Sequence, residues 1–97
     1  MPSVLEATLP ALPAVLTHEQ APRWLADAER ALASLPAGAT AVVSAAALQG
    51  FDSSALAALL ALRRGALRRG LGWRVADMPP KLRTLAEVYG VAELLPG

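Results

Sequence analysis

The sequence predicts an α/β fold in one domain, because short strand-like segments alternate with longer helical ones over its 97 residues. Residues 41–48, AVVSAAAL, are short and almost fully apolar, as expected of a buried central strand. Residues 53–69 read as a helix, and Gly70 suits the left-handed turn that ends one. Another strand-like segment, 71–78, and another helix, 79–90, follow, and the tail VAELLPG, 91–97, is expected to form one more short turn folded onto the core. Strands joined by helices of this length predict right-handed crossovers and a partly parallel sheet.

The N-terminal third supplies two further strands and the first helix. Residues 3–9 alternate between apolar and polar side chains, which is the period of a half-exposed strand. Residues 12–16 predict a second short strand, which the prolines around it restrict to an edge. A helix is expected over 18–34, with Thr17 and Gln20 spaced as in a capping box. The predicted order is β-β-α-β-α-β-α.

The spacing of apolar residues also predicts which side chains are buried. Trp24 lies on a charged stretch of the first helix, so we expect it to be partly exposed. The stripes expected to be buried are Leu25, Ala28, Leu32 and Leu35 in the first helix, Leu56, Leu60 and Leu67 in the second, and Leu82, Leu85, Ala86 and Tyr89 in the third.

Composition excludes several classes of site. The chain has no Cys and one His, which excludes disulfides, thiolate metal sites and multi-His metal sites. Its net charge of +1 gives no strong field for nucleic acid. No apolar run approaches the roughly 18 residues that a membrane span needs, and the N-terminus lacks the pattern of a signal peptide. We therefore expect a soluble cytoplasmic protein.

The segment FDSSALA, residues 51–57, has two interpretations. Asp52 is a natural N-cap for the second helix, which places Ser53 and Ser54 in its first two positions. Helix capping accounts for the presence of Asp52. The two small hydroxyls leave a flat, uncrowded helix start, which also suits a recognition or modification site.

Four arginines cluster at the end of the same helix, in LRRGALRRG. Arg64 and Arg68 share one side of the helix, and Arg63 falls near its predicted buried stripe. Cations favour a helix C-terminus, so solvation alone explains them. The alternative is that they contact an acidic patch on a partner.

No constellation predicts an enzyme. His18 has no second ligand or nucleophile in the sequence to work with, and the hydroxyls beside Asp52 have no base with an orienting partner. No phosphate-binding loop of the Walker type is present. We expect neither a catalytic site nor a bound metal or cofactor.

Three stretches together resemble a STAS domain: TAVVSAAAL, FDSSALAALLALRRGALRRG and WRVADMPPKLRTLAEVYGVAELLP. The resemblance is close over residues 41–96 and looser over 12–34. FDSSALA combined with LAEVYGVAELLP is most similar to the MlaB-type subgroup, the small subunit of the Mla phospholipid-transport ABC system. The resemblance implies a single domain over residues 1–97, with a STAS-type mixed four-stranded sheet and helices packed mainly on one face.

The resemblance also implies a function. The chain would be a non-catalytic accessory subunit that binds the ATPase subunit of an Mla-type ABC phospholipid transporter. That partner would hold it at the inner face of the inner membrane, without membrane insertion of its own. The same surface offers a route to a homodimer when the chain is isolated. The residues expected to bind the partner are Phe51, Asp52, Ser53, Ser54, Leu56, Arg64 and Arg68, with a contribution from the third helix.

The family also contains anti-sigma-factor antagonists, and these give the alternative function. In that case Ser53 would be phosphorylated by a kinase that is also the anti-sigma factor. Ser44 stands where the phosphorylated antagonists usually carry an Asp, which counts against this alternative. Ala55 stands at a position where many members of the family have Gly.

Overall fold

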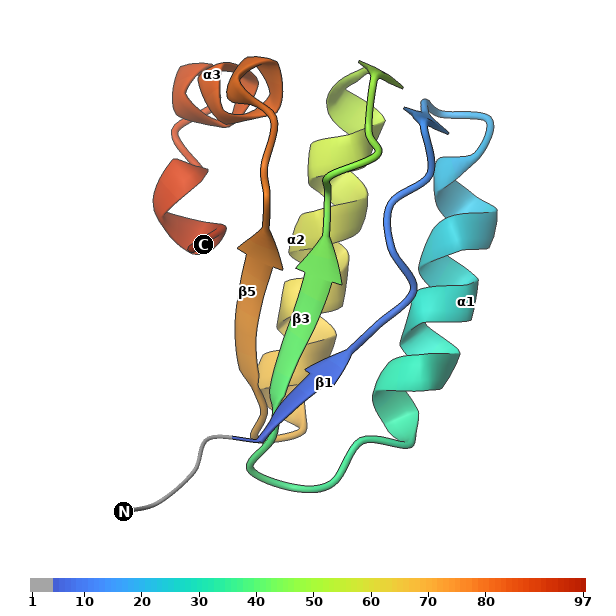
Figure 1. Cartoon of the computed structure of the whole chain (residues 1–97), viewed down its shortest axis with the longest axis vertical. Coiled ribbons are helices and arrows are strands. Elements are labelled where there is room, and N and C mark those ends of the chain that lie inside the picture. Colours follow the sequence, from blue (N-terminus) through green and yellow to red (C-terminus); the bar gives the residue numbers. More distant parts are fainter. Residues whose placement is uncertain (1–4) are drawn as a thin grey trace.

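A computed structural model of the chain describes residues 5–97. Ser3 and Val4, the start of the predicted strand 3–9, lie outside the described residues. In the described part, strands and helices alternate (Figure 1). The elements in chain order are β1 (Glu6–Thr8), β2 (Val15–Leu16), α1 (Ala21–Ala33), β3 (Thr40–Ser44), β4 (Gly50–Phe51), α2 (Ser53–Arg68), β5 (Gly72–Ala76), α3 (Pro80–Val88) and the 3-10 helix η1 (Ala92–Leu94).

The central sheet has the strand order β1-β3-β5, and both pairings are parallel. Thr8 lies beside Val42, and Val42 lies beside Arg74. The chain passes through α1 between β1 and β3 and through α2 between β3 and β5. This confirms the α/β class. It also confirms that helices connect parallel strands.

The predicted mixed sheet of four strands is not what the structure shows. Residues 12–16 contribute only β2, which forms a separate parallel pair with β4. The N–H of Leu12 donates to the Ser44 carbonyl at 2.9 Å, so the chain still follows β3 after β1 ends. Pro10 and Pro13 lack an N–H and cannot extend this ladder, so no fourth strand joins the central sheet.

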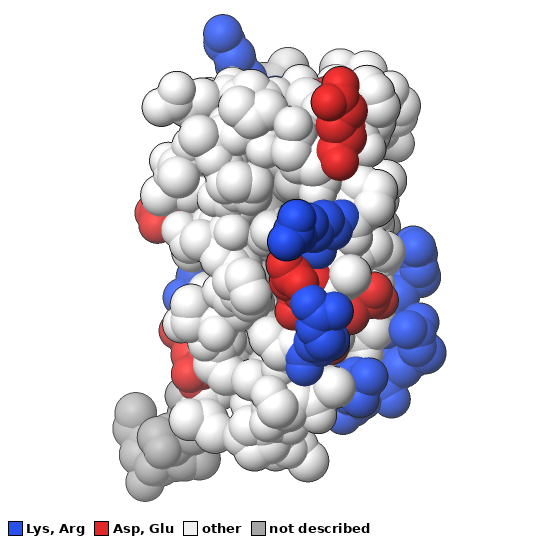
Figure 2. Space-filling view, turned by 90° about the vertical axis from the view of Figure 1, so that its right-hand side faces the viewer, with Lys and Arg blue, Asp and Glu red and all other residues white. Residues whose placement is uncertain are grey.

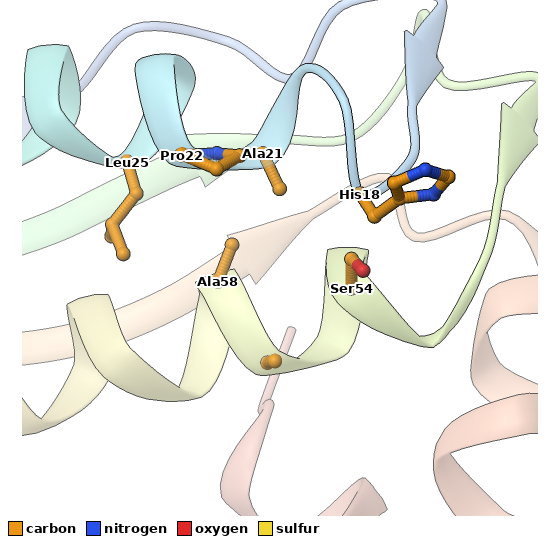
Figure 3. A pocket seen from close by; sticks show the side chains of 7 residues that line it. His18, Ala21, Pro22, Leu25, Ser54 and Ala58 are labelled. Carbon is orange, nitrogen blue, oxygen red and sulfur yellow. The ribbon is translucent and has the colours of Figure 1, made fainter.

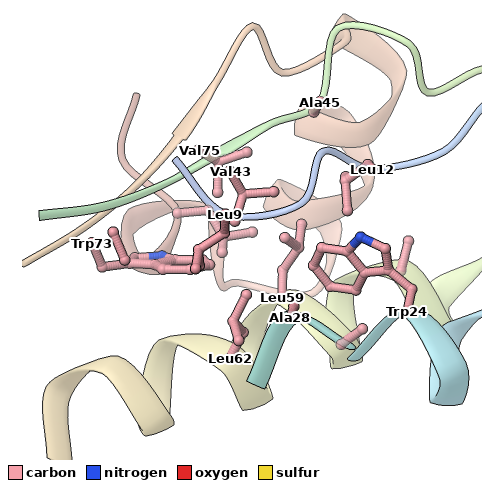
Figure 4. Close-up of a cluster of buried hydrophobic side chains, with 14 of the residues drawn as sticks. Leu9, Leu12, Trp24, Ala28, Val43, Ala45, Leu59, Leu62, Trp73 and Val75 are labelled. Carbon is pink, nitrogen blue, oxygen red and sulfur yellow. The ribbon is translucent and has the colours of Figure 1, made fainter. Parts of the chain in front are cut away.

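The core lies between the central sheet and the two long helices. Figure 1 shows α2 behind the strands and α1 beside it, and α1 packs against α2. Val43 and Val75 on the strands and Leu59 and Leu62 on α2 meet in one apolar cluster (Figure 4). On the other face of the sheet, the Arg74 guanidinium donates to both Glu6 carboxylate oxygens, at 2.9 and 3.0 Å.

The boundaries of the two long helices follow from their caps. α2 begins at Ser53 as predicted, and Gly70 follows its end with a φ of 72°. α1 begins at Ala21, three residues later than predicted. The N–H of Thr17 donates to Gln20 Oε1 at 2.9 Å, so this pair closes the turn that precedes the helix.

Trp24 is buried, contrary to the prediction that it would be partly exposed. It is 8% exposed, and its indole N–H donates to the Ala11 carbonyl at 3.0 Å. Charged neighbours such as Arg23 suggested exposure. Trp24 instead shares the buried side of α1 with Ala21 and Ala28, which lie three residues before it and four after it.

The prediction that Leu67 and Tyr89 are buried is also wrong. Leu67 is 48% exposed, because α2 turns a different side, rich in small residues, toward its neighbours. At Gly65 the approach of α1 is so close that an added Cβ would lie 3.1 Å from Leu32 Cδ2. Tyr89 follows the last residue of α3 and is 59% exposed. The residues that α2 buries are Ala55, Leu56, Ala58, Leu59, Leu62, Gly65 and Ala66.

Candidate protein-binding site

Asp52 joins the start of α2 to the loop before α1. Its Oδ1 accepts the N–H of Ser54 at 2.8 Å, which is the N-cap bond of α2. Its Oδ2 accepts the N–H of His18 at 3.2 Å and lies 3.4 Å from His18 Nδ1. The backbone N–H of Ser54, and then that of His18, lowers the pKa of Asp52 below its ordinary value. One carboxylate thus holds these two segments side by side.

A groove of about 330 Å³ lies between the N-terminal turns of α1 and α2, and we call it the α1–α2 groove (Figure 3). Apart from the Ser54 hydroxyl and the His18 ring, the side chains that line it are apolar. In Figure 3, Leu25 extends toward α2 and Ala58 extends toward α1. The residues that line the groove are His18, Ala21, Pro22, Leu25, Ser54, Ala57 and Ala58.

A second groove, of about 310 Å³, lies on the other side of α2, and we call it the α2–α3 groove. Tyr89 and Val91, from the end of α3 and the turn after it, form one wall. The other wall belongs to α2. It is formed by Ser53, Leu56, Ala57 and Leu60.

Ala57 lines both grooves, so the first turns of α2 stand between them as a ridge. Ser53 and Ala57 are exposed on this ridge, and neither side chain is large. Grooves on both sides of a low ridge offer recesses for apolar side chains of another molecule. The arrangement suits close packing against a protein surface.

Charged side chains are unevenly distributed around this surface. Figure 2 shows the α1 side of the molecule, where Lys and Arg gather in the lower part, over the C-terminal half of α2 and over α1. The upper right, where the N-terminal turns of α1 and α2 lie, shows one acidic side chain and is otherwise uncharged. The α1–α2 groove therefore lies at the less charged end of the two helices.

Within residues 5–97, no three His, Cys, Asp or Glu side chains lie close enough together to hold a metal ion. None of the helices in this part of the chain combines the length and the apolar character of a membrane span.

Comparison of the sequence with models of known protein families shows which family the chain belongs to. A family model described as "Mlab, STAS domain" matches residues 11–96. The chain belongs to the MlaB-type STAS-domain family. The match covers every element from β2 to η1, and it confirms the resemblance seen in the sequence. No curated protein matches the chain.

This STAS domain brings four of the predicted binding residues together at the start of α2. Ser53 is exposed, while Phe51, Asp52 and Ser54 are half-buried. Leu56 was predicted both to lie in the buried stripe of this helix and to bind the partner. It is 3% exposed, which confirms its burial, and it lines the α2–α3 groove without offering an exposed side chain.

Arg64 and Arg68 are exposed and line neither groove of the STAS domain, although Arg64 lies only one helical turn beyond Leu60, at the end of the α2–α3 groove. At a rise of ~1.5 Å per residue, they are about 16 and 22 Å beyond Ser53 along α2. A partner can therefore contact these two arginines only if it extends along α2 beyond the helix start.

Several residues of the STAS domain line the grooves without having been predicted at the site. Pro22 and Leu25 come from α1, and Tyr89 and Val91 come from the other end of the chain. Apolar spacing assigns a residue to one side of its own helix, but it does not say which helix lies next to it. For Tyr89 and Val91 the sequence offered two signals, the expected contribution of the third helix and the YGV segment that resembles the family pattern.

Proposed function

We propose that this STAS domain is a non-catalytic accessory subunit that binds the ATPase subunit of an Mla-type ABC phospholipid transporter. In this proposal the partner holds the domain on the cytoplasmic side of the inner membrane. The ATPase packs against the ridge at the start of α2 and inserts side chains into the two grooves.

The observation that carries the proposal is the pair of apolar grooves that share Ala57, in a chain of the MlaB-type family. Protein interfaces are centred on well-packed side chains from which water is excluded. Ser53 at the end of the ridge is small enough to let a partner approach closely. STAS domains are generally non-catalytic, which agrees with a role in binding.

A binding subunit of this kind acts by shifting the equilibrium between the conformers of its partner. If the STAS domain binds one conformer of the ATPase more tightly than another, it raises the population of that conformer. The size of the change is limited by the difference between the two affinities.

The test uses the tagged chain together with the ATPase subunit of the same organism. Ala57→Arg places a long cation on the ridge between the grooves, and closing the interface would then bury an unpaired charge. We expect affinity to fall by about 30-fold or more, as for a central interface residue. Ala57 is exposed, so the variant should fold, and circular dichroism checks this.

The matched control is Ala37→Arg. Ala37 is also exposed, and it lies in the turn between α1 and β3, at the opposite end of the molecule from the grooves (Figure 1). This variant should bind as the wild type does. Equal binding by all three proteins would place the interface elsewhere. Recovery of an anti-sigma-factor kinase from the native host, instead of the ATPase, would favour the antagonist function with phosphorylation at Ser53.

A further inference from the structure

The C-terminal end of α2 carries a second surface, which we call the basic patch. It consists of Arg63, Arg64, Arg68 and Arg69 around the exposed side chain of Leu67. Within residues 5–97, none of these arginines takes part in an ion pair. The pairs found there join other residues, namely Asp52 to His18, Asp27 to Arg30 and Glu6 to Arg74. Four cations within seven residues therefore have no acidic partner in the described part of the chain.

The basic patch lies on the same side of α2 as the ridge. Residues separated by three or four positions share one side of a helix. Ser53, Ala57 and Leu60 are followed at these spacings by Arg64 and Arg68. All except the half-buried Leu60 are exposed. A partner that covers the ridge and extends along α2 therefore meets these two arginines.

The dimensions allow one partner to cover both surfaces. The exposed side of α2 from Ser53 to Arg68 is about 22 Å long, at ~1.5 Å per residue. A standard protein interface buries ~800 Å² on each partner, which corresponds to a patch roughly 30 Å across. The grooves and the basic patch fit within one such interface, with the grooves at its apolar end.

We propose that the basic patch binds an acidic segment of the same protein partner that occupies the grooves. This inference rests on the proposed function, and it adds the chemistry of the partner. Carboxylates opposite Arg64 and Arg68 would pair with guanidinium groups that have no acidic partner within residues 5–97. Such contacts at the rim of an interface fix its orientation and speed the encounter.

The surroundings of the patch favour an acidic protein over an anionic membrane. Figure 2 shows acidic side chains mixed with basic ones over α1 beside the arginines, so this side of the molecule is not the uniformly basic surface that an anionic membrane attracts. The patch has Leu67 as its only large exposed apolar side chain within residues 5–97, whereas membrane-surface helices present a wide apolar face.

The test measures affinity for the ATPase subunit over a range of salt concentrations. Reversing both charges, with Arg64→Glu and Arg68→Glu, should weaken binding about tenfold at low salt and reduce its salt dependence. Arg64→Gln with Arg68→Gln should give a smaller loss, and it serves as the second variant if the reversal impairs folding. The control is Arg23→Glu with Lys81→Glu, which changes the net charge equally at exposed positions outside both grooves.

The outcomes separate this inference from the proposed function. If the wild type does not bind the ATPase at all, both fail. If Ala57→Arg abolishes binding while the changes at Arg64 and Arg68 match the control, only the acidic partner segment is wrong. Vesicles of phosphatidylglycerol and of phosphatidylcholine complete the test. Binding of the chain alone to the anionic vesicles, lost in the double reversal, would assign the patch to lipid and overturn the inference.

Discussion

At the scale of single residues, Asp52 connects two segments of the candidate site. Its two carboxylate oxygens accept hydrogen bonds from Ser54 at the start of α2 and from His18 in the loop before α1. The first bond was predictable, because an N-cap acts two residues along the chain. The second joins residues that are 34 positions apart, and no local pattern in the sequence indicates it.

We expect the stability of the domain to depend on pH through this carboxylate. Its pKa is lower in the folded state than its ordinary value of 3.8. The stabilisation is therefore present in full above that value and is lost as pH falls through the lower, folded pKa. Asp52→Asn keeps an oxygen for the cap but does not titrate, so its free energy of unfolding should fall less steeply in acid.

Urea unfolding at a series of pH values checks this prediction. Asp52→Ala removes the acceptor and should be less stable than Asp52→Asn at neutral pH. Ser53→Ala, at an exposed position beside the cap, should keep the pH dependence of the wild type. Parallel acid curves for Asp52→Asn and the wild type would show that this carboxylate does not contribute.

At the scale of elements, glycines allow neighbouring strands and helices to pack closely against one another. The backbone of β5 passes Thr40 on β3 so closely that a Cβ on Gly72 would lie 2.6 Å from Thr40 Oγ1. The same principle orients α2, which turns Gly65 toward α1. Sequence periodicity located α2 and its N-cap correctly. It misjudged the helix's rotation because small residues carry little hydropathic signal, and Leu67 was consequently predicted to be buried.

Gly72→Ala should therefore destabilise the domain by about 1–3 kcal/mol, as overpacking does. In a Thr40→Ala background the same change should cost less, because the hydroxyl at 2.6 Å is gone. A double-mutant cycle of unfolding free energies measures the difference. Additive effects would mean that the two residues do not interfere.

At the scale of the whole molecule, the segment after α3 folds back onto the sheet. Leu95 is fully buried, and the N–H of Val75 on β5 donates to the Pro96 carbonyl at 2.8 Å. This segment includes Val91, so its packing against the sheet also positions part of one wall of the α2–α3 groove. The sequence predicted a short turn folded onto the core. It did not predict that the turn would also help to shape the site.

Leu95→Ala should lower the free energy of unfolding by about 2–5 kcal/mol, as buried leucines do. Leu67→Ala is the matched control, because the same atoms are removed from a side chain that is half exposed. Its cost should be well under that of Leu95→Ala. Chemical denaturation of both variants measures this, and equal costs would contradict the burial of Leu95.

The parallel pairing of the strands has a consequence for how fast the domain folds. Within residues 5–97 no two strands form a hairpin, since each pairing in either sheet is parallel. Parallel neighbours can meet only after the intervening loop and helix have been enclosed, so early contacts join distant parts of the chain. Folding should therefore be slower than for helical bundles of this size. Substitutions in α1 and α2 can then change the rate of folding as well as stability.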